Sequence, residues 1–198
     1  MAKINFKKSL TDIVLYIIIY IVVQIFLTYA GAGIWAAVKD EGYQATLLAM
    51  HTGNNAILTA LTTVFSNVIT LIIFLKAKWT PLTRNYLQSK PWISLLWVAL
   101  FTLGAIIPLE FVYEQIGVEM DADTERVFAS LMKEPWGYVA IGILAPLAEE
   151  IVFRGAILRT LLDMVSKKNH WVAIFISAAV FGLIHGNKAQ FINALLMG

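Results

Sequence analysis

The sequence of 198 residues lacks cysteine and carries little charge. Without cysteine, disulfides, thiolate nucleophiles and thiolate metal ligands are excluded. Only 14% of the residues are charged and 59% are hydrophobic, whereas a soluble globular domain is about 25% charged. The net charge of +2 gives no reason to expect nucleic acid as a partner. The composition therefore predicts a membrane protein whose partners are membrane lipid and apolar substrates.

Apolar runs without charge divide the chain into membrane-sized segments. They cover residues 13–35, 56–75, 92–109, 137–148 and 171–184. The first three reach or approach the ~20 residues with which a helix crosses a bilayer. A barrel would need an alternating pattern that is absent, and helices also satisfy their backbone in lipid. We expect an all-α fold, a polytopic transmembrane helical bundle of five spans. Residues 189–198 are too short to cross and would form an incomplete sixth span.

The charges between these runs change sign along the chain. Lysine and arginine predominate at the N-terminus, after the second run and after the fourth run. Residues 110–134 hold seven acids against Arg126 and Lys133. The positive-inside rule then predicts a multi-pass protein with a cytoplasmic N-terminus. We expect the membrane to be the plasma membrane of a prokaryote. Within this acidic segment, residues 125–134 have helical periodicity and would lie in the interface or pack on neighbouring helices.

Three ionisable residues interrupt the fourth apolar segment. Glu149, Glu150 and Arg154 follow one another in the stretch LAPLAEEIVFRG. A charge at mid-membrane costs ~2.5–3.5 kcal/mol on insertion scales, so each needs compensation. Glu150 and Arg154 are spaced i, i+4 with the acid first, which favours an ion pair. Glu149 points about 100° away around an α-helix and needs another partner.

His185 on the following run is the expected partner of Glu149. If residues 166–170 form the tip of a helical hairpin, positions 149 and 185 lie at the same distance from it. Ser177, Phe181 and His185 recur at every fourth position, so they share one helix face. A carboxylate and an imidazole at one level in a membrane cavity can activate water by general-base chemistry.

The same two side chains are also types that bind zinc. Glu149 and His185 alone are too few for a closed metal site, and no HExxH helix supplies a second one. The sequence therefore leaves open a divalent metal such as zinc, held in part by Glu149 and His185, and a metal-free mechanism.

The two motifs resemble those of a known family. Residues 149–154 match EExxxR and residues 181–185 match FxxxH. In this order and on consecutive apolar segments, they resemble the CPBP (Abi) intramembrane proteases, which include CAAX prenyl endopeptidases and bacteriocin-processing or self-immunity proteins. The resemblance covers residues 145–198. It divides the chain into an N-terminal region of three spans and an acidic loop, residues 1–134, and a partial protease core, residues 135–198.

The resemblance implies roles for four residues. Glu149 would be the base that activates water, His185 would assist it, and Glu150 with Arg154 would form a supporting or metal-related pair. The family pattern continues with a helix bearing a histidine and, four positions on, Asn or Asp, to which no residue here corresponds. We therefore expect a truncated or inactive core, or a relative that does not cleave.

The expected activity is hydrolysis of a peptide bond in a membrane-associated or prenylated-type peptide or protein. Two other classes fit the same residues. One is a noncatalytic membrane scaffold or bacteriocin self-immunity protein. The other is a component of a proton-coupled transporter, in which Glu149 and His185 would relay protons.

Overall fold

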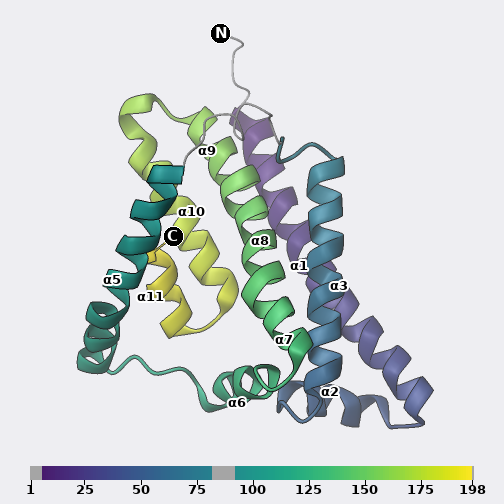
Figure 1. Cartoon of the computed structure of the whole chain (residues 1–198). Helices are drawn as coiled ribbons and strands as arrows, with labels where there is room; N and C mark the ends of the chain where they lie inside the picture. Colours follow the sequence, from purple (N-terminus) through teal and green to yellow (C-terminus); the bar gives the residue numbers. More distant parts are fainter. Residues whose placement is uncertain (1–5, 82–91, 198) are drawn as a thin grey trace.

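The computed structural model describes residues 6–81 and 92–197, and every regular element in these ranges is helical (Figure 1). This confirms the predicted all-α class. The elements, in chain order, are α1 (Phe6–Lys39), α2 (Tyr43–His51), α3 (Ala56–Lys76), α5 (Trp92–Ile116), α6 (Ala122–Leu131), α7 (Pro135–Val139), η1 (Ala140–Leu144), α8 (Ala145–Glu149), η2 (Glu150–Leu158), α9 (Arg159–Met164), η3 (Lys167–Asn169), α10 (His170–His185) and α11 (Lys188–Met197).

Three helices in the described ranges, α1, α3 and α5, are long and apolar enough to cross a membrane. They contain the first three apolar runs of the sequence and identify an integral membrane protein. The 34 residues of α1 extend roughly 50 Å at 1.5 Å per residue, which exceeds the ~30 Å hydrocarbon core. The fourth run lies in a continuous helical rod from α7 to α9, and the fifth is α10, with 16 residues. The total number of spans stays a prediction.

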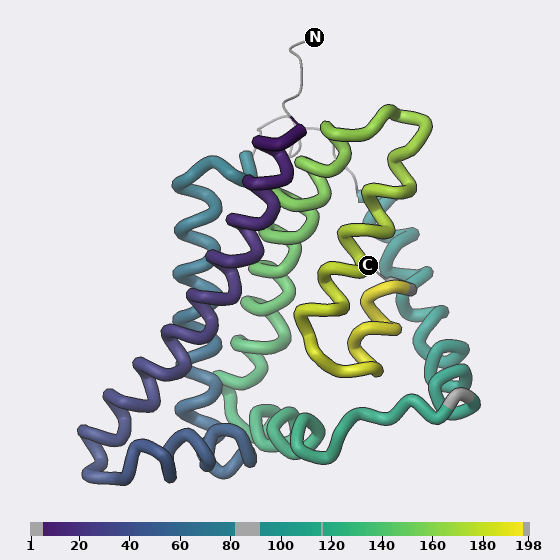
Figure 2. Tube along the Cα trace, turned by 180° about the vertical axis from the view of Figure 1, so that it is seen from behind, coloured from purple at the N-terminus to yellow at the C-terminus, as the bar shows by residue number. Residues whose placement is uncertain are grey.

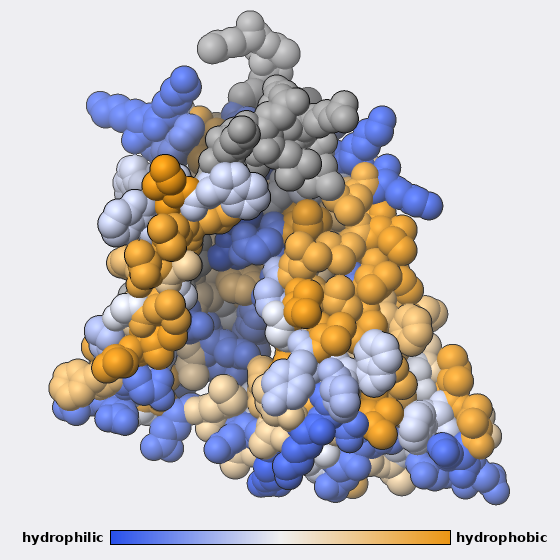
Figure 3. All heavy atoms as spheres, in the orientation of Figure 1, coloured by the Kyte–Doolittle hydropathy of each residue, from blue (hydrophilic) through white to orange (hydrophobic). Residues whose placement is uncertain are grey.

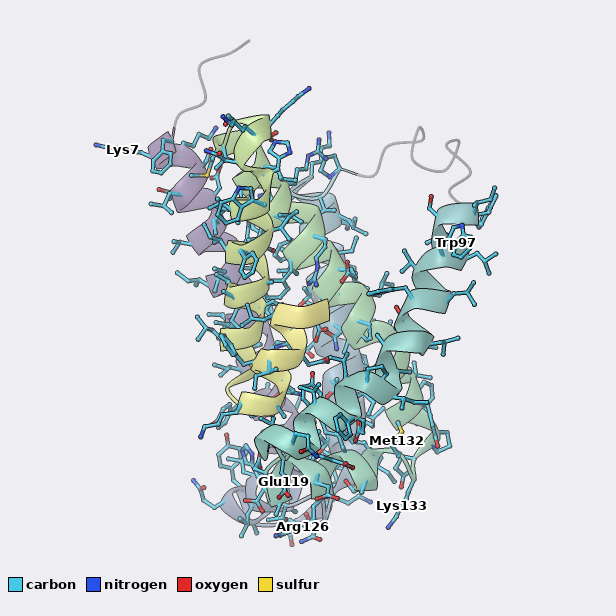
Figure 4. All side chains as sticks on the ribbon, turned by 90° about the vertical axis from the view of Figure 1, so that its left-hand side faces the viewer. Lys7, Trp97, Glu119, Arg126, Met132 and Lys133 are labelled. Atoms are coloured by element: carbon cyan, nitrogen blue, oxygen red, sulfur yellow. The ribbon has the colours of Figure 1, made fainter. Side chains whose placement is uncertain are left out.

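The charged segments separate to the two ends of the molecule. Figure 4 shows Lys7 at one end and Glu119, Arg126 and Lys133 at the other. The C-terminal end of α3 and the turn at η3, both lysine-bearing, lie at the Lys7 end (Figure 1). Apolar side chains cover the helices between the two ends (Figure 3). This arrangement agrees with the alternation of charge in the sequence, while the orientation in the membrane stays a prediction.

The core lies where α1, α3, η2 and α10 converge. Phe74 of α3 and Phe153 of η2 are fully buried there, together with small residues such as Ala156 and Ala173. Small side chains let helix backbones approach closely, and close packing drives helix association in lipid. The core therefore fixes the position of η2, which bears the EExxxR motif, against α10, which bears FxxxH.

The helix α5 lies apart from this core. No residue of its apolar window is buried, and the face of the molecule is hollowed between α5 and the α8 rod (Figure 3). A hydrogen bond of 3.3 Å from the Tyr113 hydroxyl to Asn193 Oδ1 joins α5 to α11. The side chains of α5 thus contribute little to the packing around the motifs.

Two connecting segments are more ordered than their sequence suggested. The first loop contains the helix α2, which we did not predict. The helix expected at residues 125–134 begins earlier, because Asp121 accepts hydrogen bonds from the backbone N–H and the hydroxyl of Thr124 at 2.9 and 2.6 Å. These bonds hold the pKa of the Asp121 carboxyl below its usual value. α6 packs on α2, α3 and α7, which agrees with the second of the two expected arrangements.

The C-terminal segment turns back on the preceding helix. Gly186 has φ of +71°, a left-handed conformation that glycine adopts without steric cost. After this turn α11 packs along α10 (Figure 2). Gly182 allows the close approach, since a Cβ there would meet the Phe191 ring at 2.8 Å and the Phe191 backbone at 3.1 Å.

Gly137→Ala should destabilise the fold, because the new Cβ would overlap the backbone carbonyl of Leu131, which cannot move independently. Overpacking of this kind costs about 1–3 kcal/mol, measurable as a lower midpoint of unfolding in detergent. Gly104→Ala is the matched control: nothing lies within 4 Å of its Cβ, and alanine favours a helix by ~0.5–1 kcal/mol. Equal midpoints for the two variants would contradict the clash.

Candidate active site

The hairpin formed by α8, η2, α9 and α10 brings Glu149 and His185 together. Its tip is the η3 turn, as the sequence predicted, and Glu149 Oε1 lies 3.7 Å from His185 Nε2. Their side chains are 21% and 23% exposed, respectively. The distance is too long for a direct hydrogen bond.

A backbone carbonyl determines which nitrogen of His185 carries hydrogen. His185 Nδ1 lies 2.8 Å from the carbonyl oxygen of Phe181. A carbonyl oxygen can only accept, so Nδ1 must be the donor in this bond. A neutral His185 then presents the lone pair of Nε2 to Glu149, and a charged one presents an N–H. The pair can therefore exchange one proton between a carboxylate and an imidazole.

The predicted face of α10 contacts η2 along its length. The Ser177 hydroxyl donates to the carbonyl oxygen of Phe153 at 3.4 Å. The ring of Phe181 packs edge-to-face against Phe153 at 4.8 Å and against His185 at 4.6 Å. These contacts hold the imidazole in position, so Phe181 acts through packing.

Glu150 and Arg154 form a pair separate from Glu149. Arg154 Nε lies 3.5 Å from Glu150 Oε1, and the Glu150 side chain is 59% exposed. The Arg154 guanidinium also stacks over the Phe181 ring at 4.8 Å, a favourable cation–π contact. The structure thus confirms the predicted i, i+4 pair. The Arg154 side chain of this pair packs on the Phe181 ring, and this ring in turn packs on the His185 imidazole.

The motif helix departs from the α-helical geometry that the sequence reasoning assumed. Glu150–Leu158 has π-helical hydrogen bonding, in which each N–H bonds five residues back, a form that is frequent at functional sites. Thr80, from the segment after α3, donates its hydroxyl to the Ile151 carbonyl at 2.7 Å. Gly155 permits this approach, because a Cβ there would overlap the Thr80 side chain. A contact distant in sequence therefore braces this segment.

A pocket of about 470 Å³ opens beside the Glu149–His185 pair, within the usual size range of small-molecule and peptide sites. Its polar lining consists of Tyr20, Gln24, Thr63 and Asn67, which face it together with Glu149 and His185. The remaining lining residues are apolar. Sequence reasoning did not assign Tyr20, Gln24, Thr63 or Asn67 to the site. The available signal was a carboxamide near the middle of each of the first two apolar runs, Gln24 in residues 13–35 and Asn67 in residues 56–75.

The described residues do not make up a metal site. No group of three or more His, Cys, Asp or Glu side chains comes together within residues 6–81 and 92–197. Glu149 and His185 provide two donors, whereas a catalytic zinc is held by three protein ligands. We therefore derive no step through a metal from these residues.

A helical membrane protein with a carboxylate–imidazole pair beside an internal pocket is the class that fold and site define. Residues 131–198 match the family model described as type II CAAX prenyl endopeptidase Rce1-like. This match supports the resemblance drawn from the two motifs.

A curated relative supports the same assignment. Over 137 residues the chain is 26% identical to the "Putative membrane peptidase YdiL" of Bacillus subtilis (strain 168), covering 66% of this chain and 54% of that protein. The chain thus spans about half the length of this relative. No solved structure gives a significant match. The comparisons support a membrane protease at the level of the family.

Thr80→Val should lower stability by about 0.5–1.5 kcal/mol, because it removes the hydrogen bond to Ile151 while keeping the shape of the side chain. Thr70→Val provides the control. The Thr70 hydroxyl is buried and has no hydrogen-bond partner among the described residues, so its removal should leave stability unchanged or raise it. Chemical denaturation in detergent measures both, and equal losses would show that the Thr80 bond is not the cause.

Proposed function

We propose that the chain is, or forms part of, a membrane-embedded endopeptidase that hydrolyses a peptide bond of a membrane-associated or prenylated-type peptide. The observation that supports this most is the approach of Glu149 Oε1 to His185 Nε2 at 3.7 Å beside the pocket. The match of residues 131–198 to a CAAX prenyl endopeptidase family adds the substrate class. The relative named as a peptidase agrees with the reaction.

In the proposed reaction, Glu149 is the general base. Its carboxylate takes a proton from a water molecule as the water oxygen bonds to the carbonyl carbon of the substrate. The carbonyl π electrons move onto oxygen and form a tetrahedral oxyanion. When the oxyanion collapses, the C–N bond breaks and the proton passes from Glu149 to the leaving nitrogen. The products are a carboxylic acid and an amine.

His185 would orient the water and share the proton. With Nδ1 bonded to the Phe181 carbonyl, Nε2 is the nitrogen directed at Glu149 and at the water between them. A neutral imidazole accepts a hydrogen bond from this water through Nε2, and a protonated one can donate to the leaving nitrogen. Glu150 and Arg154 would support this arrangement through the contact of Arg154 with Phe181.

The surrounding helices favour this chemistry because they limit access of bulk water. Most of the exposed surface area of the pocket walls is apolar, although the walls also include several polar side chains. In surroundings of low dielectric, charges and fixed dipoles interact more strongly than they do in water. A prenylated or otherwise hydrophobic peptide would enter from the membrane with little desolvation cost.

Glu149→Gln and His185→Ala should each abolish cleavage of a prenylated fluorogenic peptide by the protein in lipid nanodiscs. Glutamine keeps the shape of the side chain but cannot take the proton, and the alanine variant loses the imidazole. We expect kcat to fall by roughly 10²–10⁴-fold, the usual contribution of a general base. Release of the fluorophore measures the rate.

Glu125→Gln and His51→Ala are the matched controls, because both side chains are exposed and lie outside the pocket. They should cleave at the parental rate. Cleavage at that rate by Glu149→Gln would refute the assignment. A parent that does not cleave, but loses proton flux in vesicles when Glu149 is changed, would instead indicate a transporter component.

A further inference from the structure

Two carboxamide side chains line the Glu149–His185 pocket from helices outside the family match. Gln24 lies near the middle of α1 and Asn67 near the middle of α3. Asn67 is only 2% exposed. Polar groups at this depth of apolar helices are costly unless they are hydrogen-bonded, so every donor and acceptor has to be accounted for.

A chain of hydrogen bonds fixes the orientation of both amides. Asn67 Nδ2 donates to the carbonyl oxygen of Thr63 at 2.9 Å. Because that carbonyl can only accept, the amide nitrogen of Asn67 must face it, and Asn67 Oδ1 faces Gln24. Gln24 Nε2 then donates to Asn67 Oδ1 at 3.4 Å. Gln24 Oε1 lies 2.6 Å from the Ser66 hydroxyl, whose single hydrogen also has the Thr63 carbonyl as an acceptor at 3.0 Å. A flip of either amide would place like groups against each other.

One N–H of each carboxamide remains after this accounting. Each NH₂ group has two hydrogens, and only one in each is used within the described residues. Both side chains border the pocket, and these two N–H groups have no acceptor among the described residues. The neighbouring Thr63 hydroxyl is already committed, since it donates to the Thr59 carbonyl at 2.8 Å.

The pocket lining therefore combines two kinds of polar group. Glu149 and His185 provide a proton acceptor, while Gln24 and Asn67 provide neutral donors. A peptide carbonyl oxygen is an acceptor with two lone pairs, which suits two amide donors. In an apolar pocket, fixed donors of this kind stabilise the negative charge that develops on such an oxygen during attack.

We propose that Gln24 and Asn67 are the hydrogen-bond donors that bind the carbonyl oxygen of the peptide bond attacked by the water at Glu149. This rests on the proposed endopeptidase function and assigns the part of the site that holds the substrate. It gives α1 and α3 a direct role in the reaction. If the two amides served only to join α1 to α3, their loss would lower stability and leave the kinetics of the folded protein unchanged.

The first test is kinetic and uses the protein in lipid nanodiscs with the fluorogenic prenylated peptide. Asn67→Leu and Gln24→Leu keep side-chain size but remove the donors. Asn67→Leu should lower kcat by roughly 10²–10³-fold, as loss of one oxyanion donor does elsewhere, with a smaller change in KM. Thr70→Val, on the same face of α3 but outside the pocket lining, should keep the parental kcat. Each rate is divided by the concentration of folded protein, which size-exclusion chromatography measures.

The second test measures binding and does not depend on turnover. The probe is a lipidated peptide aldehyde, whose hydrate has two hydroxyls on one carbon and so resembles the tetrahedral intermediate. The control ligand is the corresponding alcohol, which has only one oxygen on that carbon. Asn67→Leu and Gln24→Leu should weaken aldehyde binding by roughly tenfold or more, the effect of about 1.4 kcal/mol, and should leave alcohol binding unchanged. If Asn67→Leu does not fold, Gln24→Leu decides alone.

The outcomes separate this inference from the function on which it rests. Parental kcat and aldehyde affinity in the folded leucine variants would overturn the donor role and leave the endopeptidase intact. If the parent does not cleave the peptide but the variants still lose aldehyde affinity, the endopeptidase function would be refuted and the carbonyl-binding site would be supported. A parent that does not bind the aldehyde would overturn the donor role.

Discussion

The meeting of one carboxylate and one imidazole inside a bundle of apolar helices is the constraint on which this structure depends. Glu149 and His185 come from different helices and approach to 3.7 Å. Either charge alone would be costly in surroundings of low dielectric, and each compensates the other. Their contact requires that the hairpin through η3 keep its register, since a shift of one residue on α10 would turn the imidazole by about 100°. The packing of Phe181 on Phe153 and the bond from Nδ1 to the Phe181 carbonyl maintain that register.

The site is divided between two parts of the chain. The segment that matches the CAAX prenyl endopeptidase family, residues 131–198, contains both members of the pair. Other residues of the pocket lining come from α1 and α3, which provide Gln24 and Asn67. A reactive pair alone is not enough for catalysis, because the substrate must also be held by a surface that orients the bond to be broken. In the proposed reaction the first two long helices supply that surface.

Glycines allow close contacts between the elements that hold the two motifs in place. Gly155 lets Thr80 reach the Ile151 carbonyl, and Gly182 lets α11 pack on α10. Both glycines lie within one position of a motif residue, Arg154 and Phe181. Without a hydrophobic driving force between helices in lipid, such close contacts and interhelical hydrogen bonds hold the elements together. The geometry of the pair is thus set by backbone proximity as much as by the polar side chains themselves.

The sequence by itself determined the fold class and the main features of the reactive pair. Long uncharged runs require helices in lipid, the i, i+4 spacing pairs Glu150 with Arg154, and the equal distance from the hairpin tip places Glu149 beside His185. These inferences depend on local periodicity and on one connection of fixed length, which the sequence displays directly.

Tertiary structure alone decided the rest. The π-helical form of Glu150–Leu158, the contact of Thr80 with Ile151 and the position of Gln24 and Asn67 on the pocket wall depend on how α1 and α3 pack against η2. Periodicity gives the face of a helix that bears a polar residue but not the helix that it will meet, since that depends on crossing angles and side-chain fit along the whole interface.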